Sequence, residues 1–301
     1  MMLSPEAQAM RAQLRAFYDE LAGARDLSLV EGRVVANRYN ELTGPVEGVT
    51  WTPVQIGDLS AIWAEADGVD TSRVIQFHHG GGYMFGDAEV YRAYTGHLSR
   101  ATGARVLSVD YRLVPEHPHP APVSDAIAAY EWLQEQGVPA DRIVFAGNSA
   151  GGGLSLGTLL ELLRRGLPVP AGVVAMSPMA DMTLSGGTWT SNVASDIRAQ
   201  GTGTQTSAKL YAGRTDPADP VVSPVFGDYT GAPPLYISAG SGEVFLDDAL
   251  RVAASARDAG VSVMLDVAPG FNHDYEIGVG RVPEADALFA RIGGWVRSIL
   301  P

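Results

Sequence analysis

A serine flanked by glycines constrains this chain more than any other feature of its sequence. The segment GNSAG at 147–151 has the pattern G-x-S-x-G, directly after an apolar strand candidate at 142–147 and directly before a helix candidate that begins near Ala150. This context is typical of a strained strand-to-helix turn that holds a serine hydroxyl clear of a sheet. Side chains at the two glycine positions would collide with the neighbouring strand or helix. The pattern predicts Ser149 to be a nucleophile.

Apolar strand candidates alternate with helix candidates along most of the chain. Such alternation predicts an α/β fold with a mostly parallel sheet covered on both faces. The residues from Arg33 to Glu65 favour short β-type stretches, and a Gly-, Ser- and Thr-rich insertion between Asp181 and Pro233 predicts a functional loop or lid. The strands are expected at 74–79, 105–112, 142–147, 172–178, 234–240 and 261–269, and helices at 4–22, 123–136, 150–165, 247–259 and 283–300.

A second glycine motif, HGGG at 79–82, follows the strand candidate at 74–79. Acyl transfer builds negative charge on a carbonyl oxygen, and preorganised backbone N–H groups stabilise that charge. Consecutive glycines let the backbone approach closely and expose successive N–H groups. Gly81 and Gly82, together with Ala150 after the nucleophile, are therefore predicted to form an oxyanion hole. His79 is expected to brace the loop by hydrogen bonding.

The base is expected to be His273. It is the only histidine that follows Ser149 in the chain, and it lies in a loop just after the last predicted strand. A nucleophile of the G-x-S-x-G type is followed along the chain first by its acid and then by its histidine.

The acid should follow the strand at 234–240, where three carboxylates compete. Glu243 lies in the loop beyond that strand and is favoured, while Asp247 is the runner-up. Asp247 and Asp248 begin the next predicted helix, where a carboxylate also has the structural task of complementing the helix dipole. Asp274 is next to the predicted base and is expected to point elsewhere.

Composition excludes several other classes of function. A formal net charge of −13 argues against nucleic acid and against an anionic membrane surface as partners. The chain has no cysteine, which excludes thiolate catalysis, disulfides and cysteine-ligated metals. No long apolar run or signal-like segment is present, so we expect a cytoplasmic protein without a membrane anchor. A homo-oligomer is left open.

Several of these segments together resemble the hormone-sensitive-lipase-like bacterial esterases of the α/β-hydrolase superfamily. The resemblance extends from about Val74 to the C-terminus and rests on HHGGGYMFG, DYRLVPEHPHPAPVSDA, GNSAGG and the GFNH loop. It places the family's triad on Ser149, Glu243 and His273, and its oxyanion hole on Gly81, Gly82 and Ala150. The chain departs from the common pattern at Asn148 and Glu243, where many relatives carry Asp.

The resemblance implies an α/β-hydrolase fold with an eight-stranded sheet. A single domain is expected over 1–301, with a small helical cap from about 1–40 and 185–215. It also implies a serine carboxylesterase for short- to medium-chain esters that needs no metal or cofactor. A lactone hydrolase is the alternative, and a non-catalytic ligand receptor is disfavoured because all three triad residues are present. The aromatic residues proposed for the substrate pocket are Tyr83, Phe85, Trp189 and Phe245.

Overall fold

The protein is built around one eight-stranded sheet. The computed structural model describes residues 3–23, 28–197 and 203–300. The strand order is β1-β2-β4-β3-β5-β6-β7-β8, with β1, β2 and β4 paired antiparallel and all other neighbours parallel. The mostly parallel α/β fold is confirmed. The strands are β1 (Val49–Ile56), β2 (Leu59–Ala66), β3 (Asp70–His78), β4 (Ala104–Val109), β5 (Ile143–Asn148), β6 (Gly172–Met176), β7 (Leu235–Gly240) and β8 (Val263–Ala268).

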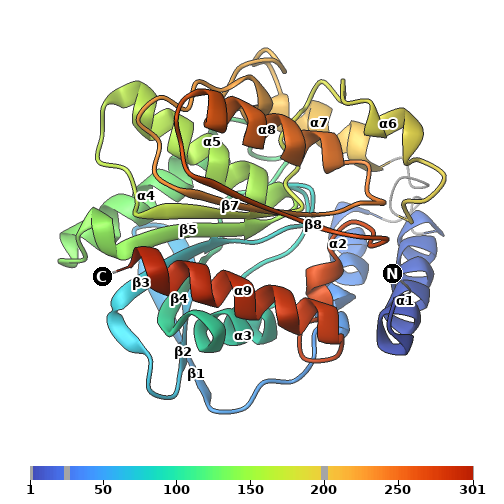
Figure 1. The fold of residues 1–301 in the computed structure, drawn as a ribbon, viewed down its shortest axis with the longest axis horizontal. Helices are drawn as coiled ribbons and strands as arrows, with labels where there is room; N and C mark the ends of the chain where they lie inside the picture. The colour runs from blue at the N-terminus through green and yellow to red at the C-terminus, as the bar shows by residue number, and fades with distance from the viewer. Residues whose placement is uncertain (1–2, 24–27, 198–202, 301) are drawn as a thin grey trace.

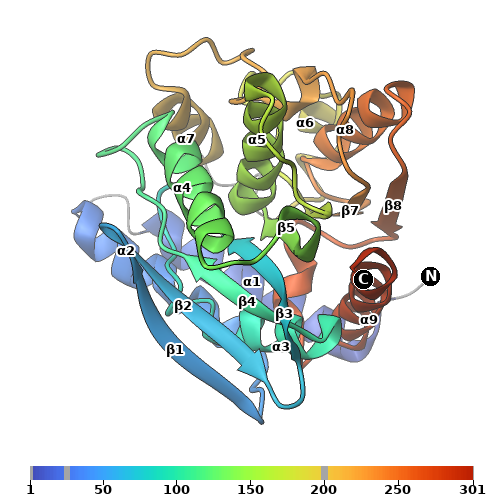
Figure 2. The ribbon, with the colours of Figure 1, turned by 90° about the vertical axis from the view of Figure 1, so that its left-hand side faces the viewer.

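Helices cover both faces of the sheet (Figures 1 and 2). One face carries α4 (Ala121–Glu135), α5 (Ala150–Arg165) and α8 (Leu246–Asp258), and the other carries α3 (Arg92–Thr102) and α9 (Pro283–Ile299). Every residue of β5, β6 and β7 is buried, because these central strands have a helical layer on each side. The apolar side chains accordingly form two clusters, one on each side of the sheet.

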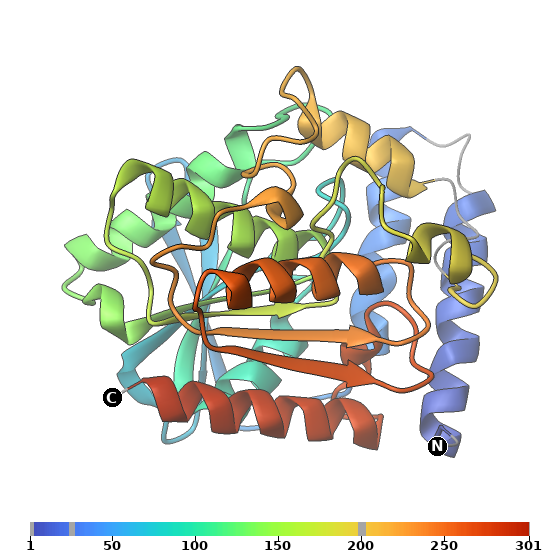
Figure 3. The same ribbon diagram turned by 45° about the horizontal axis from the view of Figure 1, so that its top comes forward.

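Helices from the N-terminal segment and from the segment after β6 lie beyond the carboxyl ends of the strands. Figure 3 shows the arrowheads of β7 and β8 pointing towards α1 (Pro5–Gly23), with α6 (Thr188–Ser191) nearby. The chain continues from α1 to α2 (Leu29–Asn37), and α7 (Gly203–Ala212) lies on the same side. Short 3₁₀ turns occur at η2 (Arg38–Leu42), η3 (Ala140–Arg142), η5 (Pro224–Phe226) and η6 (Tyr275–Gly278).

The β-type pattern expected from Arg33 onward is wrong for its first part, because α2 and η2 occupy residues 29–42. The Ser28 hydroxyl accepts a hydrogen bond from the Glu31 backbone, and the Glu31 carboxylate accepts one from the Ser28 backbone. This reciprocal capping box starts the helix. The S-x-x-E spacing was present in the sequence and could have predicted the helix.

Across the three described ranges, every helix falls short of the length or apolar character that crossing a bilayer requires.

Candidate active site

Ser149 sits on a sharp turn between β5 and α5. Its φ of +53° and ψ of −121° are unusual for a residue with a side chain, and such strain often marks functional positions. The turn depends on the two flanking glycines. A Cβ at Gly147 would overlap the backbone of Gly151, and a Cβ at Gly151 would overlap the carbonyl of His78 at the end of β3.

His273 reaches Ser149 from the loop after β8. The Ser149 Oγ lies 2.9 Å from His273 Nε2, close enough for the hydroxyl to donate a hydrogen bond to the imidazole. Both side chains are buried. The Phe245 ring packs against the imidazole, with ring centroids 4.7 Å apart. The structure thus brings together the two residues that the motifs singled out.

Glu243 lies on the opposite side of the imidazole, in the turn that follows β7. Its Oε2 is 3.9 Å from His273 Nδ1, which is longer than a hydrogen bond. The same oxygen accepts hydrogen bonds from the Ser177 hydroxyl at 2.9 Å and the Gly240 N–H at 3.1 Å. Burial raises the pKa of the Glu243 carboxyl well above its usual range, and these two donors oppose the rise.

The rival acids have other partners. Asp247 accepts a hydrogen bond from the Thr188 N–H at 3.1 Å, and Asp248 accepts from two N–H groups that follow β6. The sequence analysis expected Asp274 to point away from His273, and this expectation is wrong. Asp274 Oδ2 lies 3.4 Å from His273 Nε2. Among the described residues, no group of three histidines or carboxylates is placed to hold a metal ion.

The HGGG segment forms a tight loop after β3. Gly81 and Gly82 have φ values of +112° and +62°, which suit glycine far better than residues with a side chain. The Ser207 hydroxyl of α7 donates to the Gly82 carbonyl. His79 lies within the loop, with Nδ1 2.8 Å from the Gly80 carbonyl and its ring stacked on Tyr111 at 4.2 Å. Burial lowers the pKa of His79 to about 4, so it remains neutral at neutral pH.

Asn148, next to Ser149, links the glycine loop to the loop after β8 that carries His273. Its Oδ1 accepts a hydrogen bond from the Gly80 N–H at 3.0 Å. Its Nδ2 donates to the Tyr91 hydroxyl at 3.3 Å and to Asp274 Oδ1 at 3.4 Å. Sequence reasoning expected only a local effect from this residue. The amide can donate to Asp274, which an ionised aspartate at position 148 could not do.

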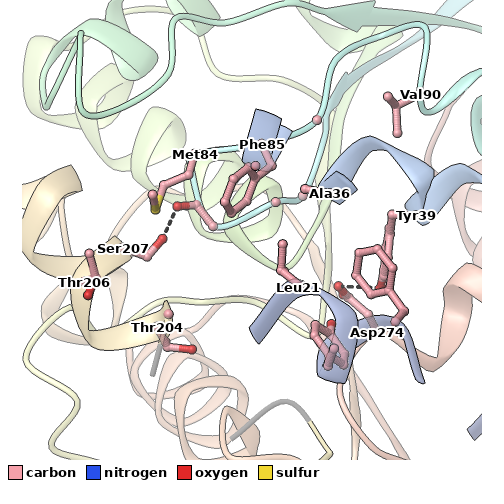
Figure 4. Close-up of a pocket in the computed structure, with 18 of the residues that line it drawn as sticks. Leu21, Ala36, Tyr39, Met84, Phe85, Val90, Thr204, Thr206, Ser207 and Asp274 are labelled. Carbon is pink, nitrogen blue, oxygen red and sulfur yellow. Dashed lines mark hydrogen bonds between the residues drawn. The ribbon is translucent and has the colours of Figure 1, made fainter. Parts of the chain in front are cut away.

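A cavity of about 470 Å³ opens beside the glycine loop (Figure 4). Its walls come from α1, α2, α7 and the glycine loop (Gly80–Gly82 and Met84–Gly86), with Asp274 on the side of His273. Segments that are distant in sequence therefore meet over the same loop. Asp274 and Tyr39 are joined by a hydrogen bond at one side of this cavity, while Ser207 and Met84 lie at the other (Figure 4).

The four aromatic residues expected in the pocket have different locations. Phe85 lines the cavity. Tyr83 instead lies in the core, with its ring stacked on Tyr211 at 3.7 Å. Trp189 packs edge-on against Phe245, which in turn contacts the base. The cavity walls do not include Tyr83, Trp189 or Phe245, because these rings are used to pack the core and to support His273.

Residues 75–277 match the family described as the α/β-hydrolase fold, and this segment contains both glycine motifs together with Ser149, Glu243 and His273. The chain is an α/β-hydrolase.

The hydrolase is similar to an acetyl-hydrolase and to bacterial esterases. It is 34% identical over 297 residues to an acetyl-hydrolase of Streptomyces hygroscopicus, covering 99% of this chain and 98% of that protein. It is 34% identical over 227 residues to an esterase of Acinetobacter venetianus, covering 74% of each. A crystal structure of an esterase from the bacterial hormone-sensitive lipase family superposes with a TM-score of 0.93 at 34% identity, covering 100% of both chains. The family resemblance is confirmed.

Proposed function

We propose that this carboxylic ester hydrolase cleaves its substrates through an acyl-enzyme on Ser149, with His273 as general base and Glu243 as the acid that orients it. The observation that carries the proposal is the 2.9 Å contact between Ser149 Oγ and His273 Nε2 on a strained turn. A hydroxyl within hydrogen-bond reach of an imidazole can lose its proton as it attacks.

The reaction has two halves. Ser149 Oγ forms a bond to the ester carbonyl carbon while His273 takes the hydroxyl proton, and the carbonyl oxygen becomes negatively charged. The N–H groups of Gly81, Gly82 and Ala150 stabilise that charge. The C–O bond to the alcohol then breaks, and His273 gives its proton to the leaving alkoxide. Water repeats the sequence on the acyl-enzyme, releasing the acid and restoring Ser149.

The substrates we propose are short- to medium-chain esters. A cavity of about 470 Å³ suits a small molecule and is at the lower end of the usual range for ligand pockets. The similarity to an acetyl-hydrolase supports a short acyl group. A crystal structure of a related protein, EstE5, which is 31% identical, comes from a soak with p-nitrophenyl butyrate. Lactone opening would use the same three residues, so a lactone belongs in the same substrate panel.

We propose that residues 1–40 and 185–215 act as a cap over the site, within one domain that spans the chain. The support is that α1, α2 and α7 supply most of the cavity wall opposite the glycine loop. Residues 1–2, 24–27 and 198–202 of these segments lie outside the described part of the chain.

A series of p-nitrophenyl esters tests the mechanism and the chain length together. We expect kcat/KM to be highest between acetate and hexanoate and to fall steeply at palmitate.

Rapid mixing should give an initial burst of p-nitrophenol equal to the enzyme concentration wherever deacylation is slower than acylation, because one acyl group is held on each Ser149. Palmitate as the best substrate would contradict the chain-length proposal. An acyl group trapped on any residue other than Ser149 would contradict the mechanism.

The kcat/KM for ester hydrolysis should fall as the pH is lowered below neutrality. An imidazole acts as a base only when it is neutral, and a histidine side chain ordinarily titrates near pH ~6.5. Glu243 must be ionised to hold the imidazolium, and burial raises its pKa, so its protonation begins at a higher pH than for an ordinary carboxyl. Both groups therefore gain protons as the pH falls. We expect kcat/KM to fall on the acid side of neutrality and to level off above it. A profile that is flat from weakly acidic to weakly alkaline pH, with chemistry rate-limiting, would contradict this.

A further inference from the structure

One face of α2 forms part of the cavity wall. Leu29, Gly32 and Ala36 all line the cavity, and their spacing of three and four residues places them on the same side of the helix. Gly32 lies between the other two along this face, so a side chain at position 32 would project into the cavity. The open volume therefore depends in part on the missing side chain at this position.

Neither the backbone nor the packing requires a glycine at position 32. Its φ lies outside the left-handed region, and it sits inside a helix, where glycine is less favourable than alanine. Apart from the adjoining residues and the backbone of the helix itself, no atom of the described residues would lie within 4 Å of a Cβ at Gly32. Gly147 and Gly151 differ in this respect, since a Cβ at either would overlap neighbouring backbone. A side chain at position 32 would thus occupy open space in the cavity.

Hydrogen bonds hold α2 against the glycine loop. The Arg33 Nε donates to the Met84 carbonyl at 3.0 Å, and the guanidinium forms a bidentate pair with the Glu116 carboxylate at 2.8 Å. One turn later, Asn37 Oδ1 accepts a hydrogen bond from the Gly86 N–H at 3.3 Å. A movement of α2 away from the loop would break these contacts. A larger side chain at position 32 is therefore expected to reduce the cavity and not to displace the helix.

We propose that Gly32 is a specificity-determining residue, which leaves room for an aliphatic chain of the ester beside the glycine loop. The proposal rests on the ester hydrolysis proposed above and names the wall that limits chain length at that site. The same cavity is lined by the apolar side chains of Phe17, Leu21 and Met84, which suit a hydrocarbon chain. The chain belongs to the acid half or to the alcohol half of the ester, and the experiment distinguishes the two.

Replacing Gly32 by alanine and by leucine tests the proposal with two pairs of esters. p-Nitrophenyl acetate and hexanoate differ in the acyl chain, and ethyl and hexyl acetate differ in the alcohol chain. The measurement is the ratio of kcat/KM for the long ester to kcat/KM for the short one, which does not depend on the fraction of active enzyme. We expect Gly32→Leu to lower this ratio by about tenfold or more in at least one pair, because the new side chain occupies the space of the longer chain. Gly32→Ala should lower the ratio by about threefold.

Gly294→Leu is the matched control. Gly294 lies on the exposed side of α9, again inside a helix, and no described atom outside that helix's backbone and the adjoining residues would lie within 4 Å of a Cβ there. It is not part of the cavity wall. We expect both ratios to stay within about twofold of wild type. Gly32→Ala should unfold at the wild-type temperature or above it, because alanine favours a helix.

Wild-type ratios in both pairs for Gly32→Leu would overturn the proposal, as would a rise in either ratio or an equal fall for Gly294→Leu. If Gly32→Leu does not fold, the ratios of Gly32→Ala decide in its place. If the wild-type enzyme hydrolyses these esters and the Gly32 variants keep its ratios, only the specificity proposal fails. If the wild-type enzyme hydrolyses none of the four esters, the proposed function fails, and the specificity proposal fails with it.

Discussion

Replacing Ser149 by alanine is expected to lower kcat/KM on p-nitrophenyl butyrate by about 10⁴- to 10⁶-fold, leaving only what the oxyanion hole and binding supply. The loss should be this large because the substitution removes the attacking oxygen, which lies 2.9 Å from His273 Nε2. The measurement is a steady-state assay of purified wild-type and variant enzyme under the same conditions.

The control for this substitution is a serine outside the site. Ser298→Ala, near the exposed end of α9, should leave kcat/KM within about twofold of wild type. Thermal unfolding of Ser149→Ala should resemble that of wild type, because the strained backbone depends on the flanking glycines rather than on the hydroxyl. A Ser149→Ala enzyme that retains a tenth of wild-type activity, free of contaminating esterase, would mean that another residue forms the acyl-enzyme.

Replacing Glu243 by glutamine is expected to lower kcat by about 10²- to 10⁴-fold with a small effect on KM. The amide has nearly the same shape, so the loss reports the carboxylate charge near His273 Nδ1. Without this charge the imidazolium is not stabilised in the transition state, and the neutral ring can adopt the wrong tautomer. The measurement is kcat and KM on p-nitrophenyl butyrate.

Asp247→Asn is the matched control, because Asp247 was the other acid that the sequence allowed. Asp247 lies in the first turn of α8, and its Oδ2 accepts a hydrogen bond from the Thr188 N–H of α6. An asparagine at position 247 can keep that hydrogen bond. We expect kcat to stay within about threefold of wild type. The opposite pattern, with turnover lost in Asp247→Asn and kept in Glu243→Gln, would assign the acid to Asp247.

The sheet and the triad geometry could be anticipated because their signals are local. Each central strand is buried on both faces and therefore appears as a short apolar run, such as IVFAGN in β5. The turn at Ser149 leaves a signature because a Cβ at Gly147 or Gly151 would overlap neighbouring backbone. Chain order then restricted the base to His273. The roles of Ser149, Glu243 and His273 in catalysis remain predictions for the experiments above.

The cavity was harder to predict, because its walls come from segments that no local pattern connects. Phe17 and Phe85 line the same cavity, although Phe17 lies in α1 and Phe85 follows β3. Neither Tyr83 nor Trp189 has a sequence context that shows which way its ring points. Asp274 was set aside because neighbouring side chains usually diverge, but its left-handed φ turns it towards Asn148 and Tyr39.

The cytoplasmic location remains a prediction from the sequence, and the oligomeric state remains open. Contacts within a single chain determine neither of these properties.

Labelling with a fluorophosphonate, followed by peptide mass spectrometry, tests the central claim most directly. The reagent reacts with a serine only when a neighbouring base has activated its hydroxyl. We predict one label per chain, on the peptide that contains Ser149, and none on Ser149→Ala. Wild-type enzyme that hydrolyses esters while Ser149 stays unlabelled would contradict the account.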